Sequence, residues 1–154
     1  MKPAYVFAAL SADVGCQVEA YLVRHFATIL ELVGDKTRSV AKAGRAAVIA
    51  FAKRMSLNSC AAVRCLYNML PALESTKSQV KVAALEVISM FGTESPDSVR
   101  TLMPDLVPAV CDLLHDTKVQ VTEEAEQCLA NMAKTIQNRD IDDLVPAMLE
   151  ALME

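Results

Sequence analysis

The chain has 154 residues, of which 53% are hydrophobic and 22% are charged, so it holds enough apolar material for the core of one domain. No apolar run reaches the roughly eighteen residues that a membrane span needs, so we expect no membrane-crossing helix. The net charge is −4, but residues 1–81 carry eleven Lys or Arg against five Asp or Glu, whereas residues 82–154 carry four against fourteen.

A cassette of small and apolar residues occurs three times, at spacings of 40 and 41 residues, with Val40, Val80 and Val121 as its anchors. After each anchor, such residues return at steps of four, seven, eight and eleven, which is the spacing of one helical face and not of a strand. The equivalent sets are Gly44/Ala84/Ala125, Ala47/Val87/Cys128, Val48/Ile88/Leu129 and Phe51/Phe91/Met132. Each cassette therefore predicts a helix with one buried face.

A second apolar stripe precedes each anchored helix and predicts another helix there. In chain order its positions are Leu22, Phe26, Ile29 and Val33, then Ala62, Leu66, Met69 and Leu73, then Met103, Val107, Val110 and Leu114, and finally Ile141, Val145, Met148 and Leu152. Short polar turns beginning at Gly34, Glu74 and His115 join the two helices of the three complete copies. Their side chains can accept backbone N–H bonds at the start of the following helix.

Two helices alone leave half of their apolar stripe in water, whereas stacked pairs complete a continuous core. We therefore expect an all-α fold, an α-solenoid (α-α superhelix) of HEAT- or armadillo-like helical hairpins. Proline within the first helix of a pair, at Pro108 and Pro146, favours HEAT repeats. We expect one segment over 1–154: the end of a truncated repeat (1–17), repeats over 18–55, 56–94 and 95–136, and the first helix of a further repeat (137–154), cut from a longer protein.

The first turn and the helix after it carry a group of basic residues that we take as the candidate binding site. They are Lys36, Arg38, Lys42, Arg45, Lys53 and Arg54. Arg38, Lys42, Arg45 and Lys53 share the helical face opposite Val40, and such a positive strip binds nucleic-acid phosphates by releasing counterions. A solvated helix face without a partner is the alternative, because no aromatic residues are interleaved for base stacking.

Catalytic chemistry finds little support in the sequence. No glycine-rich nucleotide loop is present, and the five cysteines have no metal-ligand spacing, which suggests a reducing compartment. A HEAT-type di-iron hydroxylase would need His-Glu pairs, whereas His25 precedes Phe26 and His115 precedes Asp116. We therefore predict no catalytic residue, no metal, no cofactor and no small-molecule substrate in this segment, and leave the oligomeric state open.

Several short stretches together resemble the N-terminal HEAT region of the translation elongation factor 3 family. They are residues 18–23 (Val-Glu-Ala-Tyr-Leu-Val), 103–108 (Met-Pro-Asp-Leu-Val-Pro), 116–121 (Asp-Thr-Lys-Val-Gln-Val) and 138–141 (Asn-Arg-Asp-Ile), with Val-Pro at 145–146. The related region of the ribosome-associated activator of the amino-acid-starvation kinase shares them. The resemblance implies a cytoplasmic, non-catalytic arm that contacts ribosomal RNA and ribosomal proteins, while ATP-binding-cassette domains elsewhere in the parent chain drive the factor. The alternative is a HEAT scaffold that binds another protein without the ribosome.

The sequence also departs from the family pattern. The family places tryptophan before the Asp-Thr-Lys turn and early in the second inner helix, where this chain has His115 and Ser78. HEAT repeats also favour a basic residue directly after the anchoring valine. Lys81 supplies it in the second copy, whereas the first and third copies have Ala41 and Thr122. These differences indicate a divergent relative.

Overall fold

A computed structural model describes residues 19–55 and 59–135 of the chain. In order, the helices are α2 (Glu19–Val33), α3 (Arg38–Met55), α4 (Ser59–Leu73), α5 (Ser78–Glu94), α6 (Pro96–Asp112), the 3₁₀ turn η2 (Leu113–His115) and α7 (Val119–Thr135). The expected truncated repeat over 1–17 and the helix over 137–154, with its stripe Ile141, Val145, Met148 and Leu152 and its proline Pro146, lie outside the described residues.

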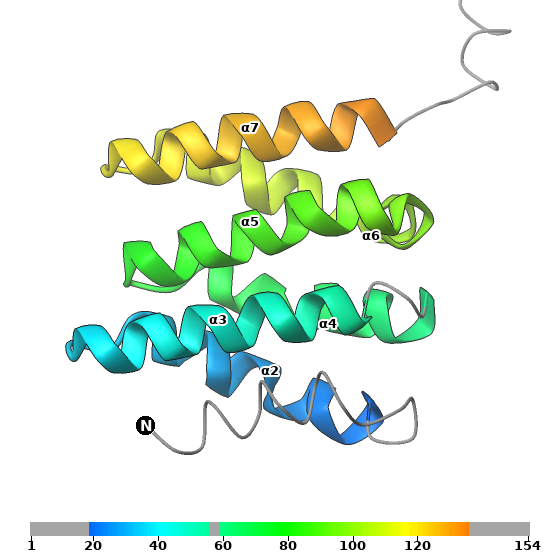
Figure 1. Ribbon diagram of the computed structural model, residues 1–154. Coiled ribbons are helices and arrows are strands. Elements are labelled where there is room, and N and C mark those ends of the chain that lie inside the picture. Colours follow the sequence, from blue (N-terminus) through cyan, green and yellow to red (C-terminus); the bar gives the residue numbers. More distant parts are fainter. Residues whose placement is uncertain (1–18, 56–58, 136–154) are drawn as a thin grey trace, which may run out of the picture.

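The helices form two layers, as predicted for an α-solenoid. In Figure 1, α3, α5 and α7 lie one above another and run in the same direction, while α2, α4 and α6 form a second layer behind them. The hairpins α2–α3, α4–α5 and α6–α7 therefore stack in register. Their three turns lie along one edge of the molecule, at the left of Figure 1. Within the described ranges, no helix is long and apolar enough to cross a membrane.

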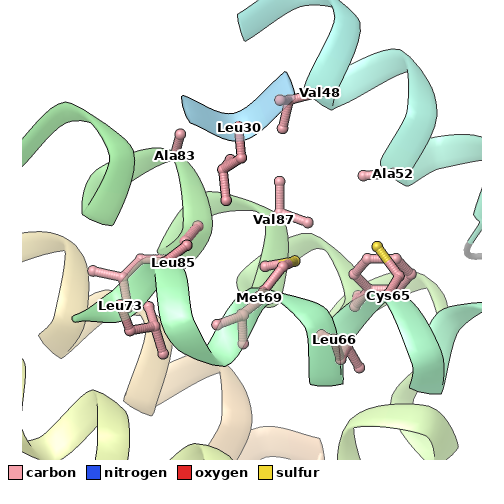
Figure 2. Packing of buried hydrophobic residues seen from close by; sticks show 14 of the residues in the cluster. Leu30, Val48, Ala52, Cys65, Leu66, Met69, Leu73, Ala83, Leu85 and Val87 are labelled. Carbon is pink, nitrogen blue, oxygen red and sulfur yellow. The ribbon is translucent and has the colours of Figure 1, made fainter. Parts of the chain in front are cut away.

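The faces that the cassette predicts to be buried are buried, except that Leu129 is half-buried at the margin, and they belong to one continuous core. Val80 and Val121 are fully enclosed, and Val40, at the start of α3, is half-buried. Figure 2 shows how the repeats interdigitate, with Leu30 of α2 lying between Ala83 and Val87 of the following hairpin. Because each hairpin covers the apolar face of its neighbour, the buried residues of all six helices form a single cluster.

Three of the four positions predicted for the stripe of the third outer helix are displaced by one residue, whereas Val110 is fully buried as predicted. Met103, Val107 and Leu114 are only half-buried at the margin of the core. The buried positions of this helix are Val99, Leu102, Leu106 and Val110, followed by Leu113 in η2. The outer helices thus keep a step of 40 residues, from Leu66 to Leu106, and the extra residue of the third copy falls after Leu113. The turn η2 accommodates it, because a 3₁₀ turn advances the chain by a different pitch from an α-helix.

Close packing of the first hairpin depends on a glycine. A Cβ atom added at Gly44 of α3 would lie 3.0 Å from the carbonyl carbon of Leu32 in α2, which is closer than side chains normally approach a backbone. The equivalent residues of the other two hairpins are Ala84 and Ala125, both fully buried. Gly44 therefore lets α3 lie directly against the backbone of α2.

Three turns begin their inner helices by the same local device. The side chain of Asp35, Ser75 or Asp116 accepts a hydrogen bond from the backbone N–H two residues later, at 2.7, 3.3 and 2.9 Å respectively. The turns thus supply acceptors as predicted, but for the backbone N–H of the residue just before each helix and not for an N–H within its first turn. At the third turn, Asp116 also accepts a hydrogen bond from Nζ of Lys81 in α5, at 2.7 Å.

The Lys81–Asp116 ion pair fastens the second hairpin to the third. Its side chains are 18% and 12% exposed, so it is shielded from water better than the other ion pairs described here. The hydrogen bond from Lys81, followed by the one from the backbone of Lys118, lowers the pKa of Asp116 below its ordinary value of 3.8. A carboxyl group with a lowered pKa stabilises the fold above its unfolded-state pKa, and this contribution disappears as the pH falls through the folded-state value.

We expect Gly44→Val to destabilise the fold by about 2 kcal/mol, because the added carbons push α3 away from α2. Urea denaturation followed by circular dichroism measures the change. Ala46→Val, on the exposed face of the same helix, is the matched control and should cost less than about 0.7 kcal/mol, the range of helix propensity. Equal losses in the two variants would contradict the close approach at Gly44.

We expect Asp116→Asn to lower Tm at neutral pH, because the amide still accepts the backbone bond but leaves the charge of Lys81 without its partner. The difference from the unchanged protein should shrink as the pH falls below 3.8, where Asp116 itself becomes protonated. Thermal melts between pH 7 and pH 2 measure this trend. Glu31→Gln, which breaks the exposed pair with Lys77, should change Tm far less.

Candidate binding groove between the inner helices

Three of the six predicted basic residues line one groove. Arg38, Lys42 and Arg45 lie on one face of α3, at successive steps of four and three residues, and face a hollow of about 370 Å³. The remaining lining residues are Ala41 of α3 itself, Val33 of α2 in the other layer, and Gln79, Val82 and Gln120 of the next two inner helices. The groove therefore lies near the turn edge of the inner layer, between α3 and its stacked neighbours.

The other three predicted residues do not line the groove. Lys36 is exposed in the turn before α3, beside the groove but outside its lining. Lys53 is exposed in the last turn of α3, several turns away. Arg54 is half-buried and lies on a different helical face from Lys53, because one residue along an α-helix rotates the side chain by about 100°. The basic strip thus divides into a clustered end near the turns and separate residues at the far end of α3.

The groove lies at the first junction, where the first hairpin meets the second. The ion pair that links the second hairpin to the third has no counterpart at the equivalent positions there. Lys81 directly follows an anchoring valine and reaches Asp116 in the next turn. The equivalent positions of the first junction hold Ala41 and Ser75, which cannot form an ion pair. Ala41 lines the groove, and α3 packs less closely against α5 than α5 packs against α7. The small side chain of Ala41 thus borders the groove at the position where the lysine of the next copy reaches across its own junction.

Charge is distributed unevenly across this surface. Arg38 and Lys42 are exposed, and no ion pair involves either of them in the described part of the chain. Arg45, in contrast, is paired with Glu86 of α5. Burial, and then the neighbouring charge of Glu86, raises the pKa of Glu124 on α7, while Arg45 lowers it. Among the lining residues, charge is thus confined to the cations of α3, whereas the residues from α5 and α7 are uncharged, and Glu86 and Glu124 lie outside the lining.

Two glutamine side chains that were not predicted from the sequence lie in the same groove. Gln79 and Gln120 each stand one residue before an anchoring valine, in the first turns of α5 and α7, and both are exposed. A glutamine side-chain amide donates two hydrogen bonds and accepts others, so it can bond to both the N–H and the C=O of a peptide backbone. Their shared place in the repeat is the feature of the sequence that points to them.

The other candidate positions show no arrangement for catalysis. Cys111 is half-buried and His115 is exposed, and among the described residues no group of three or more His, Cys, Asp or Glu could hold a metal ion. Burial raises the pKa of the Cys65 thiol, and it raises that of Cys128 to about 11. Both thiols are therefore protonated at neutral pH, when a thiol is a poor nucleophile.

A second hollow, of about 540 Å³, lies on the outer layer. Its lining residues are Cys60, Val63, Arg64, Tyr67 and Leu102, four of which share one face of α4. Tyr67 is 61% exposed there. This apolar surface is separate from the groove of the inner layer, and it shares none of the groove's lining residues.

Comparison with known proteins gives one family and a consistent set of relatives. The family described as the EF3 N-terminal HEAT repeat matches residues 2–129. Elongation factor 3 of Gonapodya prolifera is 31% identical over 144 residues, which is 93% of this chain and 13% of that protein. Elongation factor 3B of Saccharomyces cerevisiae is 29% identical over 150 residues, or 97% of this chain and 14% of that protein.

A relative of another name matches over the same extent. The mRNA export factor elf1 of Schizosaccharomyces pombe is 26% identical over 148 residues, which is 95% of this chain and 14% of that protein. The chain thus spans 13–14% of the length of these three relatives. The similarity accordingly concerns one part of much longer proteins.

We expect the double variant Ala41→Lys with Ser75→Asp to stabilise the fold by up to about 1 kcal/mol, because it places at the first junction the ion pair of the second. Chemical denaturation measures the gain. Ala41→Lys alone is the control and should not stabilise, because it adds a fourth cation beside Arg38, Lys42 and Arg45. A gain from the single variant equal to that of the double variant would disprove the pairing.

Proposed function

We propose that this chain, which belongs to the family of N-terminal HEAT repeat regions of elongation factor 3, serves as a non-catalytic arm of a cytoplasmic translation factor and contacts the ribosome. Its relatives named elongation factor 3 support the role in translation. The binding surface consists of the six basic residues of the first repeat: Lys36, Arg38, Lys42, Arg45, Lys53 and Arg54. The partner is ribosomal RNA or an acidic face of a ribosomal protein.

The observation that carries this proposal is the exposed, clustered charge of Arg38 and Lys42. A cation that already has a carboxylate partner must give it up before it binds a phosphate, whereas these two have no ion-pair partner within the described ranges. Lys36 lies just before them, in the turn. Such a group attracts polyanions through counterion release, with little dependence on their sequence. The helical stack holds the backbone of these residues in fixed relative positions, so binding does not have to order the main chain.

A second candidate function is a protein-binding scaffold that is not linked to the ribosome. The relative named mRNA export factor favours it, because a similar region occurs in a protein that is named for a different role. The acidic surface of α7, where Glu123 and Glu126 are exposed, also suits a basic protein partner better than RNA. Capture of a stable protein partner without ribosomes would support this scaffold in place of the ribosomal arm.

We expect the double variant Arg38→Glu with Lys42→Glu to reduce co-sedimentation with ribosomes at least tenfold, because it replaces two attractive charges by two repulsive ones. The dependence of binding on salt should also become shallower, by about one unit of the log–log slope for each phosphate that is no longer neutralised. Sedimentation of the chain with purified ribosomes at a series of potassium concentrations measures both effects.

The matched control is Arg64→Glu with Lys134→Glu, which makes the same change of charge on exposed residues of α4 and α7. This control should bind ribosomes nearly as well as the unchanged chain does at the salt concentration where the other variant fails. If both double variants lose binding equally, only the net charge matters, and the proposed surface is wrong. Binding that ignores salt and both variants would refute an electrostatic ribosome contact.

A further inference from the structure

We propose that the groove between α3 and α5 binds an extended segment of polypeptide, with acidic residues against α3 and uncharged residues across α5 and α7. The groove shares Arg38, Lys42 and Arg45 with the proposed ribosome contact. Peptide binding there does not require the ribosome, because it follows from the shape and the chemistry of the groove. The partner class, an acidic unstructured peptide, goes beyond the proposed function and beyond the family relationship.

The charge of the groove favours carboxylates near α3. Arg38 and Lys42 offer two cations without ion-pair partners in the described part of the chain, and Arg45 lies one turn further along, held by Glu86. Carboxylates are the natural partners of such side chains, and a guanidinium can bind a carboxylate with two parallel hydrogen bonds. The lining residues from α5 and α7 are the uncharged Gln79, Val82 and Gln120. A ligand that fits this arrangement carries its negative charge at the end that lies against α3.

The two glutamine amides favour an extended backbone. Gln79 and Gln120 occupy equivalent places on adjacent inner helices, so they present the same donor and acceptor groups one helix apart. Packed helices are about 8–10 Å apart, and an extended chain advances about 3.3 Å per residue. An extended peptide that crosses the inner helices thus passes one glutamine about every third residue. Each glutamine can then bond to a backbone N–H and C=O, which a folded partner has already used in its own secondary structure.

The floor of the groove is apolar. Val33, Ala41 and Val82 line it below the polar groups. Small side chains of a peptide can bury apolar surface there, while the cations and amides fix its direction. The hollow of about 370 Å³ has room for part of a single extended strand. At the next junction the equivalent place holds the ion pair between Lys81 and Asp116, so the hollow belongs to the first junction.

Single-stranded RNA matches the groove less well. No aromatic side chain is among its lining residues, so bases find no platform for stacking. RNA also carries a negative charge at every nucleotide, whereas none of the lining residues from α5 and α7 is a cation that could neutralise a phosphate. A peptide can place uncharged residues at that end. The observations therefore favour a protein segment over RNA in this groove.

The test measures fluorescence anisotropy of labelled synthetic peptides of about eight residues, titrated with the chain at low and moderate salt. One peptide has glutamates at its N-terminal end followed by serine and alanine, and a second has the reverse order. The matched peptide has glutamine in place of each glutamate, and an oligouridylate of similar extended length represents RNA. We expect one of the two acidic orders to bind at least tenfold more tightly than the glutamine peptide and the oligouridylate.

Three variants separate the contributions of charge, amides and shape. Arg38→Glu with Lys42→Glu should weaken binding of the acidic peptide at least tenfold and remove most of its salt dependence. Gln79→Ala with Gln120→Ala should weaken binding about tenfold and leave the salt dependence unchanged, because the hydrogen bonds that it removes carry no charge. Ala41→Phe, which fills the groove without altering the charge, should abolish binding. Arg64→Glu, on the outer layer, should bind like the unchanged chain.

Tm values close to that of the unchanged chain would show that each variant is folded, as its exposed or groove-facing position predicts. Failure of both acidic peptides to bind, or binding that ignores Ala41→Phe and the glutamine variant, would overturn the inference. Equal or tighter binding of the oligouridylate would also overturn it and assign the groove to RNA. Because ribosomes are absent from this experiment, peptide binding without ribosome association would refute the proposed function alone, and the reverse result would refute this inference alone.

Discussion

The structure depends on one constraint: a helical hairpin cannot cover its own apolar faces, so each one must be covered by the next. The consequence is visible in the core, where residues such as Leu30, Val48 and Val87 from successive hairpins interdigitate in one cluster. Everything else on the molecule is arranged around this stacking. The turns fall on one edge, the inner helices run in parallel, and side chains at equivalent repeat positions come to lie side by side.

Because the stacking is provided by apolar contacts, the polar residues at the junctions are free to differ, and the differences create the candidate site. The second junction has a shielded ion pair between Lys81 and Asp116, whereas the first has Ala41 and Ser75. Gly44 at the same time lets α3 approach α2 closely. The groove is therefore bordered by the small residue Ala41 and by exposed cations of α3 that take no part in the apolar core.

Much of the fold could be predicted from the sequence, because helical periodicity and the repeat spacing are local features. The anchors Val80 and Val121 and the polar turns lie where the pattern places them. Three of the four stripe positions predicted for the third outer helix were displaced by one residue, because the second spacing is 41 for the inner helices but 40 for the outer ones. The clustering of Arg38, Lys42 and Arg45 followed from their helical face. The presence of Gln79 and Gln120 in one groove did not, because it depends on how separate hairpins stack.

The unequal junctions also have a mechanical consequence. In a stack where each unit touches only its neighbours, any bending is divided among the joints in proportion to their compliance. The joint between the first and second hairpins is crossed by the exposed ion pairs Arg45–Glu86 and Lys77–Glu31 in place of a shielded one, and its inner helices pack less closely, so we expect it to be the softer joint. Bending of the solenoid would therefore concentrate at this joint, near the basic residues. A molecule bound between α3 and α5 would stiffen the joint.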